Sequence, residues 1–128
     1  MPSFDFVRLG IPCTVQTRNK SRLDNYRQDV RRIARFRWPG DVAALAVTVS
    51  VSLSYYYTVD ILDVDNIIKP ILDELKGLVY RDDIQVVKVI SQKQPVPAGG
   101  LLPVATPALS DGLRSQSDFL YVLVEWEE

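Results

Sequence analysis

Carboxylates are concentrated in one short part of the chain. Asp63 and Asp65 are separated by a single residue, and Asp82 and Asp83 follow after an apolar stretch and a turn. In an extended segment residues i and i+2 point the same way, so Asp63 and Asp65 can present their carboxylates to one point. Clustered carboxylates raise one another's pKa unless a cation neutralises them, and Mg²⁺ or Mn²⁺ prefers such oxygen ligands. These residues therefore predict a divalent-metal site, completed by one of the pair Asp82 and Asp83.

Lys69 follows Asp65 by four residues, at the start of an expected helix, and Asn66 and Asp73 fall on the same helical stripe. A divalent metal in such a site polarises a phosphodiester and generates hydroxide, while a nearby ammonium stabilises the developing charge. The pattern predicts metal-assisted phosphodiester hydrolysis with Asn66 and Asp73 in support. A second interpretation makes Lys69 a counter-ion that keeps the neighbouring carboxylates ionised without metal.

Other common catalytic groups are missing from the sequence. It has no histidine and one cysteine, Cys13, which excludes the usual zinc sites and both Ser-His-Asp and Cys-His catalysis. Apolar stretches are interrupted well before the 18 residues of a membrane span, and Asp5 interrupts the N-terminus where a signal peptide needs an apolar run. We therefore expect a cytoplasmic protein with no membrane partner.

The charge distribution suits a protein that holds a polyanion with one part and a divalent cation with another. The net charge is −1, but residues 1–40 hold nine Lys and Arg against three Asp, whereas residues 41–128 hold six against thirteen Asp and Glu. The alternative is a solvated basic face, partly paired with Asp24 and Asp29. As DNA-binding residues we predict Arg18, Lys20, Arg22, Arg27, Arg31, Arg32 and Arg35.

The chain, at 128 residues, fits one domain of ordinary size, 1–128. Alternation of apolar and polar residues predicts a long strand at 47–61, central or facing a second subunit, and helical spacing predicts two amphipathic helices. Pro70 predicts an irregular start to the second helix. The expected fold is α+β, with two helices packed in two layers on a small mixed sheet. The expected elements are strands 4–11, 47–61, 84–90 and 119–126, helices 21–38 and 66–76, and a long flexible loop at 94–117.

The acidic segment also resembles a known family. Asp63 to Leu75 reads D-x-D-N-x-x-K-x-x-x-D-x-L and Asp82 to Gln85 reads D-D-x-Q, as in the RusA family of Holliday-junction resolvases. The resemblance is tight over residues 60–90. It implies a homodimeric, Mg²⁺-dependent endonuclease, with Mn²⁺ as a substitute, that cleaves four-way junctions in branched DNA during recombination and repair. The family's essential residues correspond to Asp63, Asp65, Asp83 and Lys69.

Three other interpretations remain. An apolar strand followed by D-x-D resembles the haloacid-dehalogenase-like phosphohydrolases, with Asp63 as nucleophile and Asp65 as acid, although the chain is short and lacks the βα repeats of a parallel sheet. An EF-hand-type loop fails at Ile67 and Ile68, where an oxygen ligand and a glycine are required. The third is a dimeric module that binds junctions without cutting them.

Overall fold

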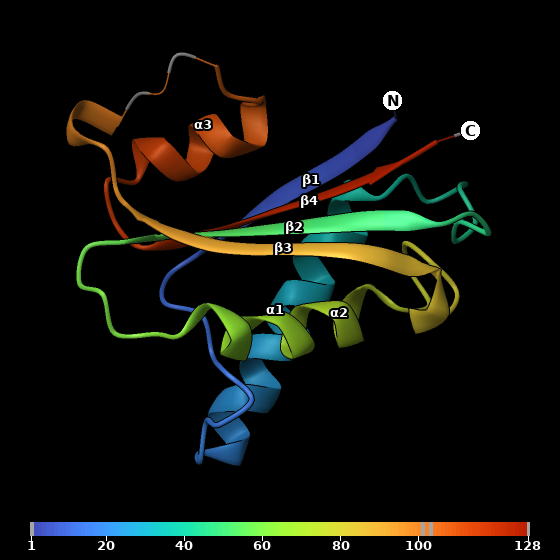
Figure 1. The fold of residues 1–128 in the computed structure, drawn as a ribbon, viewed down its shortest axis with the longest axis horizontal. Helices are drawn as coiled ribbons and strands as arrows, with labels where there is room; N and C mark the ends of the chain where they lie inside the picture. Colours follow the sequence, from blue (N-terminus) through green and yellow to red (C-terminus); the bar gives the residue numbers. More distant parts are fainter. Residues whose placement is uncertain (1, 101, 103, 128) are drawn as a thin grey trace.

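The computed structural model describes residues 2–100, 102 and 104–127, which form a four-stranded sheet with helices on both faces (Figure 1). The strands lie in the order β1-β4-β2-β3; β4 is antiparallel to both neighbours, and β2 and β3 are parallel. The sheet is therefore mixed and the fold α+β, as predicted. The strands are β1 (Ser3–Leu9), β2 (Val49–Tyr57), β3 (Val86–Pro95) and β4 (Phe119–Trp126). The helices are α1 (Lys20–Arg37), α2 (Ile68–Leu75) and α3 (Pro107–Arg114), with short 3-10 turns η1 (Val64–Ile67), η2 (Asp83–Gln85) and η3 (Ala98–Gly100).

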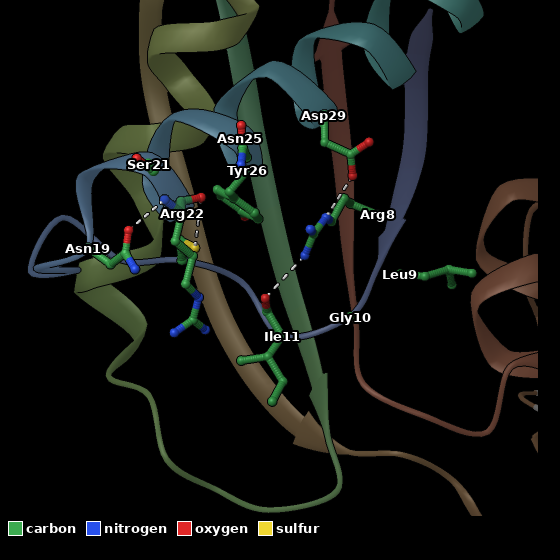
Figure 2. Close-up of a pocket in the computed structure, with 11 residues that line it drawn as sticks. Arg8, Leu9, Gly10, Ile11, Asn19, Ser21, Arg22, Asn25, Tyr26 and Asp29 are labelled. Atoms are coloured by element: carbon green, nitrogen blue, oxygen red, sulfur yellow. Dashed lines mark hydrogen bonds and ion pairs between the residues drawn. The ribbon is translucent and has the colours of Figure 1, made fainter.

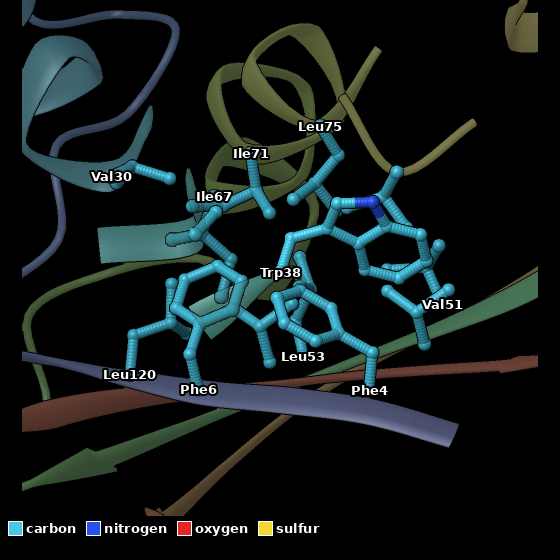
Figure 3. Packing of buried hydrophobic residues seen from close by; sticks show 14 of the residues in the cluster. Phe4, Phe6, Val30, Trp38, Val51, Leu53, Ile67, Ile71, Leu75 and Leu120 are labelled. Carbon is cyan, nitrogen blue, oxygen red and sulfur yellow. The ribbon is translucent and has the colours of Figure 1, made fainter. Parts of the chain in front are cut away.

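The main core lies between the sheet and the helices α1 and α2. Asn19 caps α1 by accepting a hydrogen bond from the Arg22 N–H, and the buried side of that helix repeats at four-residue spacing, including Tyr26 and Val30. These side chains meet the inward face of the sheet, represented by Leu53, and the buried face of α2 (Figure 3). The burial of one stripe per helix and one face per strand fixes how α1 and α2 lie on the sheet.

The strand β2 is central, as predicted, but shorter than the alternation suggested. It ends at Tyr57, and Val59 and Ile61 are 63% and 60% exposed. The alternation of apolar residues continues past Tyr57, but the backbone turns away there, because Asp118 and Lys93 hold Thr58 and Asp60 by hydrogen bonds. The predicted strand 47–61 is therefore corrected to Val49–Tyr57, and residues 58–61 belong to the exit loop.

A third helix occupies part of the segment that we expected to be a patternless loop. Thr106 caps α3, Pro107 stands in its first turn, and the buried side includes Leu109 and Leu113. These residues pack on the outer face of the sheet against β1 and β4, in a second core with Phe119. The prediction of two helices in two layers is therefore wrong: α3 adds a layer on the other face. The strand β3 also extends to Pro95, further than predicted.

The second predicted helix is broken at its start. It begins as the 3-10 turn η1 and becomes α-helical only at Ile68, two residues before Pro70, which confirms the irregular start. Its end is followed by Gly77 with φ +83°, a left-handed conformation that favours glycine. Within the described part of the chain, no helix is long and apolar enough to cross a membrane.

Candidate active site

The candidate site lies along α2, which connects two parallel neighbouring strands. Because β2 and β3 are parallel, Val86 at the start of β3 pairs with Val49 at the start of β2. Asp63 follows the end of β2, so the start of β3 lies at the other end of the strand pair. The helix α2 covers this distance, and Asp83 lies near its C-terminal end, where the Lys76 Nζ is 3.6 Å from the Asp83 Oδ2.

Three carboxylates and one ammonium border a single hollow of about 370 Å³. The residues lining it are Asp65, Ile68, Lys69, Leu72, Asp73 and Asp83. Five of them belong to η1 and α2 at the helical spacing seen in the sequence, and Asp83 comes from η2 beside it. The Lys69 Nζ lies 3.3 Å from the Asp73 Oδ1, so its charge is placed among the acids. The structure thus brings Asp65, Lys69, Asp73 and Asp83 together.

Asp63 and Asp82 do not line this hollow. Both are exposed, and no group of three or more His, Cys, Asp or Glu side chains among the described residues is close enough to hold a metal ion. Cations instead pair with two of the acids, since Lys69 and Arg27 contact Asp73 and Lys76 contacts Asp83. The donor set still suits a hard divalent cation in its chemistry, because carboxylate oxygens are the ligands that such ions prefer.

Backbone and side-chain hydrogen bonds hold the loop that carries Asp63 and Asp65. The Ser91 hydroxyl of β3 donates to the Val64 carbonyl, and the Asn66 N–H donates to the Asp63 carbonyl. The Val15 N–H donates to the Asn66 carbonyl at 3.1 Å, which fixes the segment before α1 against the same turn. Asn66 thus acts through its backbone in supporting the loop.

Lys93, which the sequence did not single out, holds the same loop from β3. Its Nζ donates to the Asp60 Oδ1 at 2.6 Å and to the Leu62 carbonyl at 2.9 Å. The hydrogen bond to Asp60 raises the pKa of Lys93, and the charge of Asp63 acts in the same direction. This cation is therefore fixed on the Asp63 side of the loop.

Comparison with known proteins identifies the family. Residues 7–99 match the family described as endodeoxyribonuclease RusA, which is more than half of the chain. The chain belongs to the RusA family. A search of curated proteins found no match. The RusA match includes the whole candidate site and ends before α3 and β4.

Gln85, the last residue of the RusA-like D-D-x-Q segment, holds the turn that presents Asp83. Its side-chain oxygen accepts from the N–H groups of Arg81 and Asp82, at 2.9 and 2.8 Å. Its side-chain nitrogen donates to the carbonyls of Leu45 and Val47, at 2.7 and 2.8 Å. The first two hydrogen bonds close the turn itself and the other two tie it to the segment before β2, so this glutamine positions Asp83.

The basic residues in and just before α1 that were predicted to bind DNA fall into three sets by their partners. The Arg27 Nε is 2.8 Å from the Glu74 Oε2, and the Arg31 Nη1 donates to the carbonyls of Glu74 and Lys76, at 2.7 and 2.8 Å. These two guanidinium groups therefore hold the C-terminal end of α2. Arg32 pairs with Asp29 on its own helix. Arg18, Lys20, Arg22 and Arg35 are exposed and make no ion pair within the described residues.

Asp118 was not found by sequence reasoning. Its buried carboxylate accepts hydrogen bonds from the Tyr55 hydroxyl and from both the N–H and the hydroxyl of Thr58. Burial raises the pKa of Asp118, but the hydrogen bonds from Thr58 and Tyr55 outweigh this and hold the pKa below its usual value. In the sequence Asp118 is recognisable only as the residue before a predicted strand, and this position does not indicate which residues it contacts.

Proposed function

We propose that this RusA-family chain is a divalent-metal-dependent endodeoxyribonuclease that cleaves phosphodiester bonds at four-way junctions in branched DNA, in recombination and repair. The observation that carries the proposal is the hollow along α2, where Asp65, Lys69, Asp73 and Asp83 meet in a chain of an endodeoxyribonuclease family. Acidic oxygens beside one ammonium suit phosphodiester hydrolysis better than acyl transfer or redox chemistry.

Asp65 and Asp83, which border the hollow, would hold Mg²⁺ or Mn²⁺. Asp63 lies outside the hollow and would have to approach it to serve as the third ligand, and Asp82, also outside, would orient or share the ion. The bound ion would supply a polarised phosphate and a hydroxide nucleophile at neutral pH. Lys69 is exposed toward the hollow, where its ammonium can stabilise charge that develops on the phosphate. Asp73 holds Lys69 in place through its carboxylate.

A homodimer is part of this proposal. Two copies related by a two-fold axis present two identical sites, which suits the paired cuts that a four-way junction requires. The exposed Arg18, Lys20, Arg22 and Arg35 supply positive charge toward the phosphates, with Arg27, Arg31 and Arg32 beside them. Because the acidic site repels phosphate, we expect DNA affinity to rise when Mg²⁺, or Ca²⁺ as a non-catalytic ion, is added at constant ionic strength.

The decisive experiment is cleavage of a labelled four-way junction and a linear duplex of the same sequences, with Mg²⁺, Mn²⁺ or Ca²⁺. We expect cleavage of the junction with the first two ions. Asp65→Asn and Asp83→Asn should abolish cleavage while leaving DNA binding intact or tighter, because each removes a negative charge near phosphate. Asp111→Asn on α3, exposed and remote in sequence from the site, serves as the charge-matched control.

Other outcomes separate the alternatives. Junction binding by a dimer without cleavage under any of these ions would support the non-cutting module. Hydrolysis of a small phosphomonoester that Asp63→Asn abolishes would support a haloacid-dehalogenase-like phosphohydrolase. Full junction cleavage by Asp63→Asn, Asp65→Asn and Asp83→Asn would overturn the assignment of these aspartates.

A further inference from the structure

A second groove lies on the other side of the N-terminal half of α1, and the function proposed above does not use it. It has a volume of about 950 Å³ and is bordered by the end of β1, the segment that follows it and α1 (Figure 2). This volume is within the range of small-ligand sites, and it is larger than that of the hollow at Asp65. The groove is therefore large enough for a planar group the size of a nucleobase.

One wall of the groove is apolar and open to solvent. Ile11 is 41% exposed and lines it, whereas the side chain of Leu9, at the end of β1, points away from the groove (Figure 2). Tyr26 also lines the groove, with the Arg8 guanidinium 4.7 Å above its ring. Tyr26 is 2% exposed, and its hydroxyl is the one buried side-chain oxygen or nitrogen without a hydrogen-bond partner in the described part of the chain. This wall therefore combines apolar surface with a hydroxyl group that lacks a hydrogen-bond partner.

The opposite wall carries side chains that can read the edge of a base. Asn25 and Arg22 are exposed on the first turns of α1 and line the groove with Asn19. The Asn19 Oδ1 accepts from the Arg22 N–H, which leaves its amide NH₂ for a ligand. Amide and guanidinium groups are the side chains that most often hydrogen-bond to base edges, and apolar or aromatic surface packs on the flat faces of bases.

The charge around the groove favours a polyanion. Arg18, Lys20 and Arg22 lie within five residues at the start of α1, and none of the three has an acidic partner among the described residues. Arg8 adds a fourth guanidinium within the groove, although it is paired with Asp29. A nucleotide with its phosphate matches this rim, whereas an apolar peptide or an acid-free ligand leaves it unused.

The groove and the candidate active site both lie beside the segment between β1 and α1. A third hollow, of about 210 Å³, is lined by Val15, Leu23, Arg27, Lys69, Pro70 and Asp73, and it shares Lys69 and Asp73 with the hollow at Asp65. Val15 comes from the same segment as Ile11 and Cys13, which line the groove. The two sites therefore flank one short segment of the chain, on opposite sides of α1.

We propose that the groove between Ile11 and Asn25 binds an unstacked nucleobase of DNA held at the candidate active site, and so determines which bases are accepted near the cut. The inference rests on the proposed function, because it assumes a branched-DNA substrate with unpaired or easily unstacked bases. The apolar wall packs on the face of the base, the Asn25 and Asn19 amides meet its edge, and Arg22 contacts the adjoining phosphate.

The test uses the full chain and four-way junctions that carry 2-aminopurine at one position each, bound in the presence of Ca²⁺. The fluorescence of 2-aminopurine increases when the base unstacks, so we expect one position near the cut to brighten. Asn25→Ala and Ile11→Ala should reduce this increase by at least half. Gln28→Ala is the matched control, because it removes an exposed amide from α1 outside the groove and should leave the signal unchanged.

A second measurement determines the base preference of cleavage. With Mg²⁺, a junction library randomised around the crossover should be cut by the wild type with a base preference, and that preference should flatten in Asn25→Ala relative to total cleavage. Unchanged preference and unchanged fluorescence in both groove variants, with cleavage by the wild type intact, would overturn this inference alone. Absence of junction binding and cleavage in the wild type would overturn the proposed function as well. A change of dimer mass in Ile11→Ala at sedimentation equilibrium would show an interface between copies and overturn the inference.

Discussion

The Asp118 carboxylate holds Thr58 through two hydrogen bonds, one from the Thr58 N–H at 3.0 Å and one from its hydroxyl at 2.6 Å. Thr58 is the first residue after β2, and Asp118 is the residue before β4. The two strands are antiparallel neighbours, so this contact fixes the point at which the chain leaves the sheet for Asp63. The loop to the candidate site is therefore anchored at its first residue by Asp118 and further along by Lys93 and Ser91.

We predict that Asp118→Asn destabilises the protein by about 1–3 kcal/mol at neutral pH, because hydrogen bonds to a charged acceptor are replaced by weaker ones in a buried position. Urea unfolding measures the change. Asp111→Asn is the control, since Asp111 forms an exposed ion pair with Arg114 and such pairs contribute about 0–1 kcal/mol. Equal stability of the two variants would contradict the anchoring role.

We also expect the stability lost in Asp118→Asn to depend on pH. The pKa of Asp118 is lowered in the folded protein, so its contribution is complete above the unfolded value of about 3.9 and disappears as the pH falls through the lower folded value. The difference in stability between the wild type and Asp118→Asn should stay constant from about pH 7 to 5 and shrink below about pH 4. A difference that is instead largest at acid pH would mean that Asp118 is protonated in the fold.

We expect a side chain at Gly112 to destabilise the protein through a steric clash. A Cβ at this position would lie 2.6 Å from two ring carbons of Phe119, because α3 packs closely on β4. Gly112→Ala should lower stability by about 1–3 kcal/mol through overpacking, which outweighs the gain of up to about 1 kcal/mol in helix propensity. Gly40→Ala is the control, since a Cβ there meets no atom within 4 Å. Thermal unfolding of both variants measures the difference, and a stabilised Gly112→Ala would contradict the close contact.

Sequence patterns predicted the elements whose burial repeats along the chain. The apolar face of α1, the alternation of β2 and the apolar run of β4 all gave the right type of element, because each repeats over at least eight residues. The helix α3 was missed because its eight residues follow a segment rich in Pro and Gly, which outweighed the pattern around Leu109 and Leu113.

The candidate site was predictable only where it depends on local spacing. The stripe of Asp65, Lys69 and Asp73 follows from the period of one helix. The placement of Asp63 away from Asp83 follows from the parallel pairing of β2 and β3, which the sequence did not reveal. Asp118 and Lys93 reach the exit loop from other strands, and contacts at such separations have no local signal.

Two roles were predicted for Lys69, stabilising the charge that develops on the phosphate and acting as a counter-ion for the acids. A single substitution can separate them. Its side chain is 72% exposed, and the ion pair with Asp73 is of the surface type that contributes about 0–1 kcal/mol. Lys69→Ala should therefore change stability by no more than about 1 kcal/mol, leave metal affinity similar or higher, and reduce junction cleavage by about 10²-fold or more. Calorimetry with Ca²⁺, thermal unfolding and single-turnover cleavage measure the three quantities. Unfolding of the metal-free variant with normal cleavage in metal would support the counter-ion role instead.

We expect substitutions of the arginines of α1 to have two different effects, a loss of stability at one pair and a loss of DNA binding at another. Arg27 and Arg31 hold Glu74 and the end of α2, so Arg27→Ala with Arg31→Ala should lower stability by about 2 kcal/mol or more in urea unfolding, because several charge-assisted hydrogen bonds are lost.

Within the described part of the chain, Arg32 and Arg35 are exposed and form no hydrogen bond or ion pair with α2. Arg32→Ala with Arg35→Ala should therefore leave stability within about 0.5 kcal/mol of the wild type. It should weaken junction binding and reduce the log–log salt slope by about one unit for each lost phosphate contact. Fluorescence anisotropy at several salt concentrations measures the slope. If the slope stayed unchanged in the second pair, this end of α1 would be a solvated surface, and the contacts to phosphate would be assigned to the segment from Arg18 to Arg22.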